Sequence, residues 1–211
     1  DDALEDLLDD APQSHQVLRV TLTRGSAVRG LGANGGNPSL LLTLDPFDPA
    51  LMFKPVALSS TAIRRNPHSV SCRLKTLSYV DNIAAAREAA SHGVEDALLL
   101  NTDGHVACTT IANLFLLKGA TLVTPARDQG IMTGVMRQTL IHSAAHLGMK
   151  AEERAVTPDE IGEADGVFLT NSLLNDVTRF GTAARAQAQL GRNDLYGKTG
   201  TTNDAVDAWF G

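Results

Sequence analysis

The chain has few lysines, few aromatic residues, only two cysteines and no excess of positive charge in its 211 residues. Its net charge is -6 and its isoelectric point is near 5.4, so no global positive field is present to attract a nucleic-acid backbone. No apolar run approaches the roughly 18 residues that a membrane-spanning helix needs. Cys72 and Cys108 form neither a disulfide framework nor a Cys-x-x-Cys motif. The sequence therefore predicts no metal site and no membrane or nucleic-acid partner, and it favours the reducing cytoplasm.

The composition that remains is typical of a globular protein. Apolar residues make up 43% of the chain and charged residues 20%, with a mean hydropathy of -0.05. The length allows one large domain or two modest ones. The chain begins with Asp1 rather than Met and has no signal-peptide pattern, and we expect that a segment upstream is missing.

The hydrophobic pattern alternates between strand and helix periods, which predicts an α+β, or mixed α/β, fold. The predicted helices cover residues 1–10, 79–92 and 135–147, with a short helix opening at residue 157. The predicted strands cover residues 17–23, 39–44, 56–63, 97–100, 105–108, 113–117, 121–124 and 167–169. Tight turns rich in Gly, Asn and Asp make hairpins of residues 97–108 and 113–124.

Lys75 is the lysine best suited to nucleophilic chemistry. It has apolar neighbours on both sides, Leu74 and Leu77, and stands just before a predicted helix. A desolvated lysine loses its proton more easily and becomes a good Schiff-base former. Lys118 and Lys150 instead occupy a turn and a helix end, where lysines are usually solvated. From the residues alone, a structural lysine with a buried stem and a solvated amine remains the alternative for Lys75.

A series of motifs resembles the class IV fold of pyridoxal-phosphate enzymes. The motifs are RLKTLSYVDNIAAARE, ALLLNTDGHV, ANLF, GVMRQ and ADGVFLTNS, in the order and at the spacing of that group. The group contains branched-chain and D-amino-acid aminotransferases and aminodeoxychorismate lyase. Three further stretches favour the lyase: RVTLTRGSAVRG, RNPH and DQGIMTGVMRQ. The resemblance extends from about Leu18 to about Val177.

The resemblance implies pyridoxal 5'-phosphate as the cofactor and assigns it contacts. Lys75 matches the lysine that forms the Schiff base and later moves protons. Tyr79 matches the position that hydrogen-bonds the cofactor's phenolic oxygen, although a core tyrosine is an equal alternative. Val135 and Met136 match the helix N-terminus whose backbone amides bind the phosphate.

Four further residues are carried over from the same resemblance. Asn171 and Ser172 match a second turn that contacts the phosphate. Arg19 and Arg29 match positions near a carboxylated substrate, although exposed strand arginines are usually only solvated.

The chain departs from the family pattern in three places. The family's small domain begins earlier, with an arginine that helps to bind the phosphate, and that arginine is not in this sequence. Cys108 stands where the family usually has a glutamate that keeps the cofactor's ring nitrogen protonated. A thiol with an ordinary pKa near 8.5 is a poor substitute for that carboxylate. The family's closing segment is replaced after about Thr178.

The C-terminal tail resembles a different group of proteins. Residues 181–211 are similar to the KTGT region of penicillin-binding transpeptidases, with Lys198 and Thr199 in that motif. The Ser-x-x-Lys nucleophile and the Ser-x-Asn motif of that chemistry are missing from the sequence. We therefore expect a truncated small domain at residues 1–70, a pseudo-barrel cofactor domain at 71–178, and an appended tail at 179–211.

The resemblance favours one function and leaves alternatives. The leading hypothesis is a homodimeric lyase that converts aminodeoxychorismate to 4-aminobenzoate and pyruvate, in folate precursor synthesis. A branched-chain or D-amino-acid aminotransferase is the alternative with the same fold. A non-catalytic remnant or fusion product is the alternative from another class, and a penicilloyl-binding protein is the most distant.

Overall fold

The computed structural model describes residues 7, 9, 15–32, 35–51 and 55–170. The chain divides into two compact units, Asp1–Pro49 and Ala50–Gly211. The division falls earlier than the boundary at residue 70 that the sequence suggested. The physical reason is that residues 58–65 form a strand that pairs within the second unit. The predicted tail at 179–211 lies outside the described residues.

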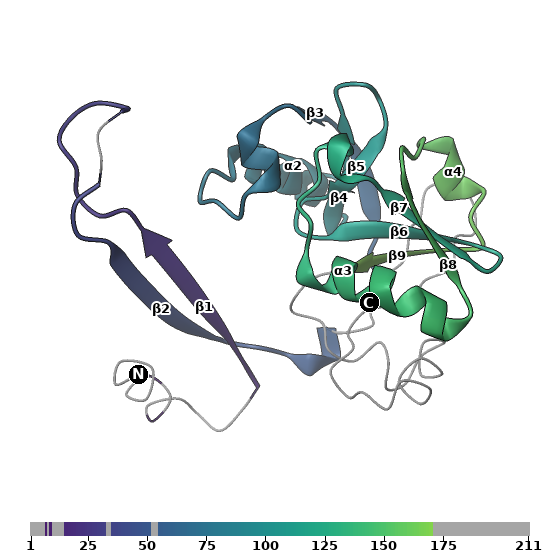
Figure 1. Cartoon of the computed structure of the whole chain (residues 1–211), viewed down its shortest axis with the longest axis horizontal. Coiled ribbons are helices and arrows are strands. Elements are labelled where there is room, and N and C mark those ends of the chain that lie inside the picture. The colour runs from purple at the N-terminus through teal and green to yellow at the C-terminus, as the bar shows by residue number, and fades with distance from the viewer. Residues whose placement is uncertain (1–6, 8, 10–14, 33–34, 52–54, 171–211) are drawn as a thin grey trace. The chain divides into compact units, whose positions relative to one another are not determined.

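The first unit contains a long antiparallel hairpin of β1 (Gln16–Thr23) and β2 (Ser39–Pro46), shown in purple and blue in Figure 1. The register runs from Gln16 opposite Pro46 to Thr23 opposite Ser39. Residues that face each other share one side of a two-stranded sheet. That rule gives the hairpin one aliphatic side, made by Leu18, Val20, Leu22, Leu40, Leu42 and Leu44.

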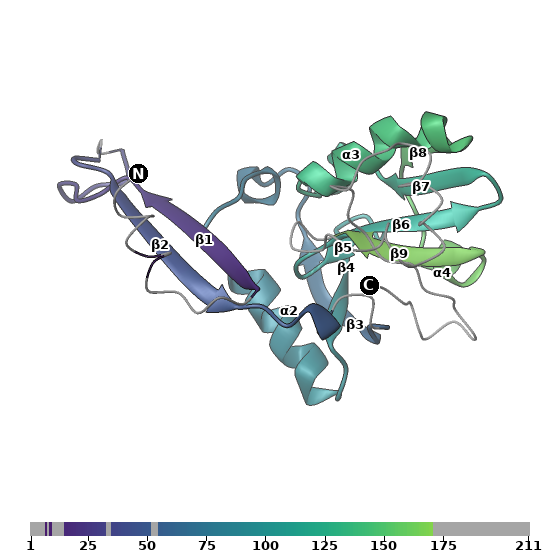
Figure 2. The same ribbon diagram turned by 90° about the horizontal axis from the view of Figure 1, so that it is seen from below.

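A three-stranded sheet opens the second unit. Its strands are β3 (Leu58–Arg65), β4 (Asp96–Asn101) and β5 (Val106–Thr109), in that order. β3 and β4 are parallel, so the chain needs a crossover, and α2 (Val80–Ser91) provides it. β4 and β5 form the predicted antiparallel hairpin. Figure 2 shows α2 beside these strands, and it packs mainly on β3 and β4.

A four-stranded sheet completes the second unit, in the order β8-β7-β6-β9. β6 (Asn113–Lys118) pairs antiparallel with both β7 (Thr121–Pro125) and β9 (Gly166–Thr170). β8 (Lys150–Arg154) is parallel to β7, and α3 (Val135–Ala144) makes the crossover between them. The two sheets and their helices confirm the expected α+β fold.

Short helical segments connect these elements. They are η1 (Pro49–Leu51), η2 (Val70–Arg73), η3 (Arg127–Gln129), η4 (Ala145–Leu147) and α4 (Asp159–Gly162). In the part of the chain that the structure describes, no helix is long and apolar enough to cross a membrane.

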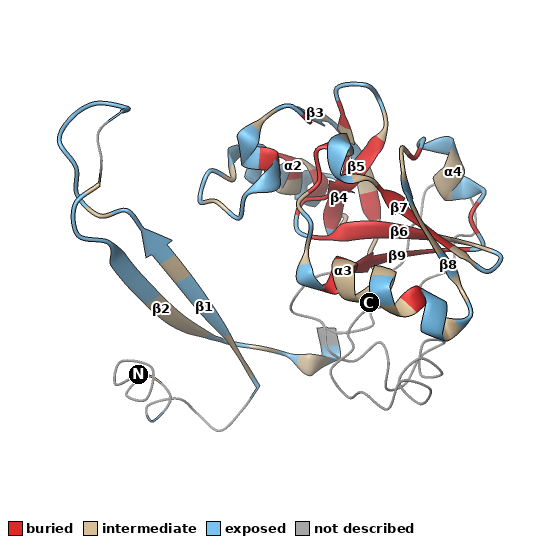
Figure 3. Ribbon diagram, in the orientation of Figure 1, coloured by how far each residue is buried: buried red, intermediate tan, exposed pale blue. Residues whose placement is uncertain are grey.

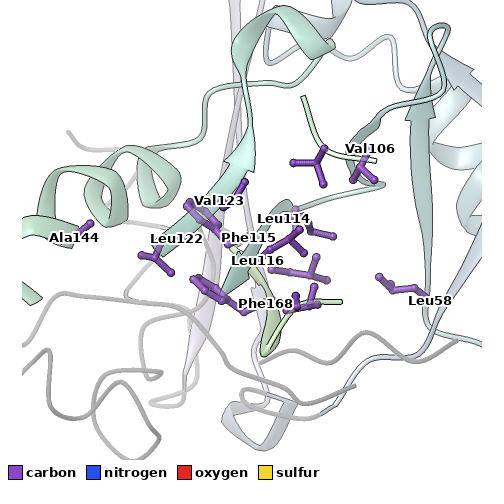
Figure 4. Close-up of a cluster of buried hydrophobic side chains, with 14 residues drawn as sticks. Leu58, Val106, Leu114, Phe115, Leu116, Leu122, Val123, Ala144 and Phe168 are labelled. Atoms are coloured by element: carbon purple, nitrogen blue, oxygen red, sulfur yellow. The ribbon is translucent and has the colours of Figure 1, made fainter. Parts of the chain in front are cut away.

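The core lies in the second unit, where the buried strands are red in Figure 3. Its larger cluster fills the space around β6, β7 and β9 (Figure 4). Phe115 and Phe168 stack there with ring centroids 5.0 Å apart and an interplanar angle of 5°. A second cluster joins α2 to the three-stranded sheet through small side chains such as Ala85, Ala89 and Cys108. These two clusters fix the ends of the strands that carry the candidate site.

Candidate active site

Lys75 lies in the irregular segment between η2 and α2, and its side chain is exposed. The expectation that apolar neighbours desolvate it is wrong for this structure. Leu74 and Leu77 are themselves 55% and 64% exposed, because the segment has no regular structure and runs along the surface of its unit. The role of Lys75 as the cofactor lysine stays a prediction.

Tyr79 caps the N-terminus of α2 and lines a pocket. Its backbone carbonyl accepts a hydrogen bond from the Ile83 amide at 2.9 Å, which begins the helix. Its half-buried side chain shares the pocket wall with Arg65, Asn82 and Met132. The pocket therefore joins residues of β3, of α2 and of the loop that leads to α3.

Cys108 is buried on β5, with 7% of its surface exposed. Burial raises the pKa of its thiol to about 11, and the nearby Arg65 guanidinium offsets only part of that rise. The side chain is therefore a neutral thiol at neutral pH. It packs with Ala85, Ala89 and Leu99, as buried free cysteines often do. A group in this state cannot supply the negative charge of a carboxylate.

The N-terminus of α3 presents free backbone amides. Gly134 is its N-cap in extended conformation, with no side-chain capping hydrogen bond. Val135, at the first helical position, is 75% exposed, while Met136 is buried. The unpaired amides of a first helical turn carry partial positive charge and bind anions. A Cβ atom at Gly134 would lie 2.8 Å from the Asn113 side-chain oxygen, so glycine allows the close approach.

Asn113 brings three segments together at this point. It begins β6 and pairs with Thr170, the last residue of β9. Its Nδ2 donates to the Met132 carbonyl at 2.9 Å, next to the pocket. The buried Thr170 hydroxyl has no hydrogen-bond partner among the described residues. Asn113 therefore adjoins both the Thr170 strand end and the N-terminus of α3, and a buried hydroxyl and helix amides are both suited to an anionic oxygen ligand such as a phosphate.

Arg137 anchors the first turn of α3 to the neighbouring strands. Its guanidinium is fully buried, and Nη2 donates to the Pro125 carbonyl at 2.8 Å and to Glu153 Oε2 at 2.7 Å. Within the described chain, its Nε and Nη1 have no partner. The helix N-terminus is thereby tied to the ends of β7 and β8.

The remaining predicted residues cannot be joined to this site. Asn171 and Ser172 follow Thr170 directly but lie outside the described residues. Arg19 on β1 and Arg29 in the following loop are exposed and belong to the first unit. Their predicted role at a substrate carboxylate stays a prediction.

Sequence analysis did not identify Arg65, Asn82 and Asn113 as site residues. Arg65 makes three hydrogen bonds around the pocket, and Asn82 joins it to the end of β5. Arg65 and Asn113 stand in the RNPH and ANLF motifs, which were used only to identify the family. Their contacts depend on segments that are distant in sequence.

Comparisons with known proteins give the same family. A model of the amino-transferase class IV family matches residues 1–178. The aminodeoxychorismate lyase of Bacillus subtilis is 29% identical over 168 residues, which cover 79% of this chain and 57% of the relative. The "putative branched-chain-amino-acid aminotransferase" of Methanocaldococcus jannaschii is 30% identical over 165 residues, with 77% and 57% covered. The chain thus spans little more than half the length of these relatives.

A solved structure is similar over most of the chain. The "putative 4-amino-4-deoxychorismate lyase" of Legionella pneumophila has a TM-score of 0.75 and 34% identity, covering 82% of this chain and 63% of its own. The family match ends at residue 178, and the resemblance of the later tail to transpeptidases stays a prediction. With 178 of its 211 residues matched, the chain belongs to the amino-transferase class IV family of pyridoxal-phosphate enzymes.

Proposed function

We propose that the chain forms the catalytic part of a lyase that converts aminodeoxychorismate to 4-aminobenzoate and pyruvate. The observation that carries this choice is the neutral, buried Cys108. When bound, pyridoxal phosphate withdraws electrons from the substrate's α-carbon, most strongly when a carboxylate keeps its ring nitrogen protonated. Cys108 cannot hold that proton. Release of pyruvate depends less on the ring than transamination does, because it also forms an aromatic product.

The residues present fit the phosphate end of the cofactor. In the part of the chain that the structure describes, the helix start at Val135 and Met136 has no side-chain cap and the Thr170 hydroxyl has no partner, so these groups are available as donors to an anion. Asn171 and Ser172, which the resemblance assigns to the phosphate, follow Thr170 directly and lie outside the described residues.

Lys75 carries the proton transfers in this proposal. Its Nζ would hold the cofactor through the aldehyde group, and as a free amine it would take the substrate's α-proton and return it to the departing pyruvate. Tyr79 lines the pocket, and its hydroxyl would donate a hydrogen bond to the cofactor's phenolic oxygen.

A product assay tests the lyase. The chain is loaded with pyridoxal phosphate and given aminodeoxychorismate, and 4-aminobenzoate is followed by its fluorescence. We expect product from the wild type and from Lys118→Ala, whose lysine ends β6 and pairs with Glu160, and none from Lys75→Ala. A cofactor that binds without product formation would support the aminotransferase. Loss of both binding and product would support the non-catalytic remnant.

A branched-chain aminotransferase is the second candidate, because the Methanocaldococcus jannaschii relative is 30% identical, close to the 29% of the lyase. Transamination of leucine with 2-oxoglutarate is measured on the same preparation. If transamination is faster than pyruvate release, the lyase proposal is wrong. We expect Cys108→Glu to raise transamination more than pyruvate release.

A homodimer in the cytoplasm completes the proposal. Exposed aliphatic side chains flank Lys75 in the sequence, namely Val70, Leu74, Leu77, Val80 and Ile83. Exposed aliphatic side chains that gather on one surface are typical of protein interfaces, and an interface here would also desolvate Lys75. Light scattering should give a dimer that Leu77→Asp converts to a monomer. Both cysteines are free, in keeping with a reducing compartment.

A further inference from the structure

Arg65 connects three segments of the second unit through one guanidinium. It ends β3, and its Nε donates to the Gly130 carbonyl at 2.8 Å. Nη1 donates to Asn82 Oδ1 at 3.2 Å, and Nη2 makes a longer contact to the Cys72 carbonyl at 3.5 Å. The side chain also lines the pocket beside Tyr79. A planar fork of donors can hold three acceptors in fixed relative positions, which a lysine cannot.

The three acceptors lie beside the two attachment points of the proposed cofactor site. Cys72 is three residues before Lys75, and Asn82 is in the first turn of α2, which starts after Tyr79. Gly130 begins the short loop that leads to the N-terminus of α3. Arg65 therefore links the segment that carries the lysine to the segment that carries the phosphate-binding amides.

The acceptors of Arg65 are themselves held in place. Gly130 has a φ of +83°, and a Cβ atom there would lie 3.1 Å from the Pro67 Cα, so its backbone conformation requires glycine. Asn82 Nδ2 donates to the Thr110 carbonyl at 2.5 Å, beyond the end of β5. The guanidinium of Arg65 thus bonds to acceptors whose own positions are restrained by other contacts.

We propose that Arg65 is a positioning residue that fixes the separation between Lys75 and the N-terminus of α3. The inference rests on the proposed function, because it concerns a cofactor bound at both ends. Binding of the phosphate raises the effective concentration of the aldehyde at the lysine only when that separation matches the cofactor. Without the fork, each attachment point still binds its own group, but the two no longer cooperate.

The test compares pyridoxal phosphate with pyridoxal, which lacks the phosphate and uses only one attachment point. Each is incubated with the protein, reduced with borohydride, and located by peptide mass spectrometry. For wild type we expect labelling of Lys75 to favour pyridoxal phosphate strongly. Arg65→Gln should lower labelling by pyridoxal phosphate at least about tenfold and leave pyridoxal labelling within about twofold. Arg64→Gln, at the exposed neighbouring position, should behave as wild type.

The outcomes separate this inference from the proposed function. If wild type shows no preference for the phosphorylated compound at Lys75, both the proposed cofactor site and the inference about Arg65 are wrong. If wild type shows the preference and Arg65→Gln keeps it, only the inference is wrong. Equal losses with both compounds would indicate a general structural role and would also overturn it. Should Arg65→Gln fail to fold, Arg65→Lys carries the test, and we expect it to lose the preference because it lacks the fork.

Discussion

The ion pair between Arg137 and Glu153 should respond very unequally to removal of its two partners. Arg137 is completely buried, whereas the Glu153 side chain is 43% exposed. Glu153→Ala leaves a buried cation that keeps the Pro125 carbonyl as its acceptor, while its Nε and Nη1 already lack partners among the described residues. An uncompensated buried charge of this kind costs about 3 kcal/mol in the free energy of unfolding.

Arg137→Met removes the buried charge and fills most of the space. Glu153 is then left to water, which its exposure allows, and the main loss is the donor to the Pro125 carbonyl, about 1 kcal/mol. Glu153→Ala should thus have a free energy of unfolding about 2 kcal/mol lower than Arg137→Met. In the Arg137→Met background no buried charge remains, so adding Glu153→Ala should lower the free energy of unfolding only slightly further.

Urea unfolding followed by far-UV circular dichroism measures these differences. Glu152→Ala is the matched control, because the neighbouring Glu152 pairs with Lys150 at the surface, where an ion pair contributes little to stability. If Arg137→Met proves as destabilising as Glu153→Ala, packing and hydrogen bonding of the arginine outweigh its charge, and the reasoning from burial is refuted.

Three further predictions concern the site and its surroundings. Gly134→Ala should weaken binding of pyridoxal phosphate about tenfold in a titration, because the new Cβ would lie 2.8 Å from the Asn113 oxygen and displace the amide; unchanged affinity would show that the amide yields freely. The hydrogen bond from Arg154 lowers the pKa of Glu160 to about 2 from an ordinary 4.5. The ionised Glu160 therefore stabilises the fold fully above pH 4.5, and this stabilisation is lost as the pH falls to 2. Glu160→Gln should flatten the pH dependence of urea stability in that window, and a parallel profile would contradict it. Neither Cys108 nor Cys72 should react with a thiol reagent in the native protein at pH 8, since both are buried, and both should react after unfolding; rapid native labelling of Cys108 would exclude its raised pKa.

Local sequence determines most of the secondary structure. The strands predicted at 113–117 and 121–124 are observed as β6 and β7, because two short apolar runs and a turn at Gly119, with a φ of +56°, are sufficient to specify a hairpin. The strand β8 was not predicted. Its sequence KAEER is polar, and its extended conformation comes from parallel pairing with β7, which is a contact between distant segments.

The candidate site also has one part that local sequence predicts and another that only tertiary packing decides. The order and spacing of the motifs were enough to identify the family and to select Lys75, because these are properties of the chain itself. The exposure of Lys75 and the neutral state of Cys108 were decided by packing, since burial depends on which segments cover a side chain. The contact of Arg65 with Gly130 joins residues 65 positions apart. Only tertiary structure can bring such groups together, because hydrogen bonds form over about 3 Å and the intervening chain does not encode that distance.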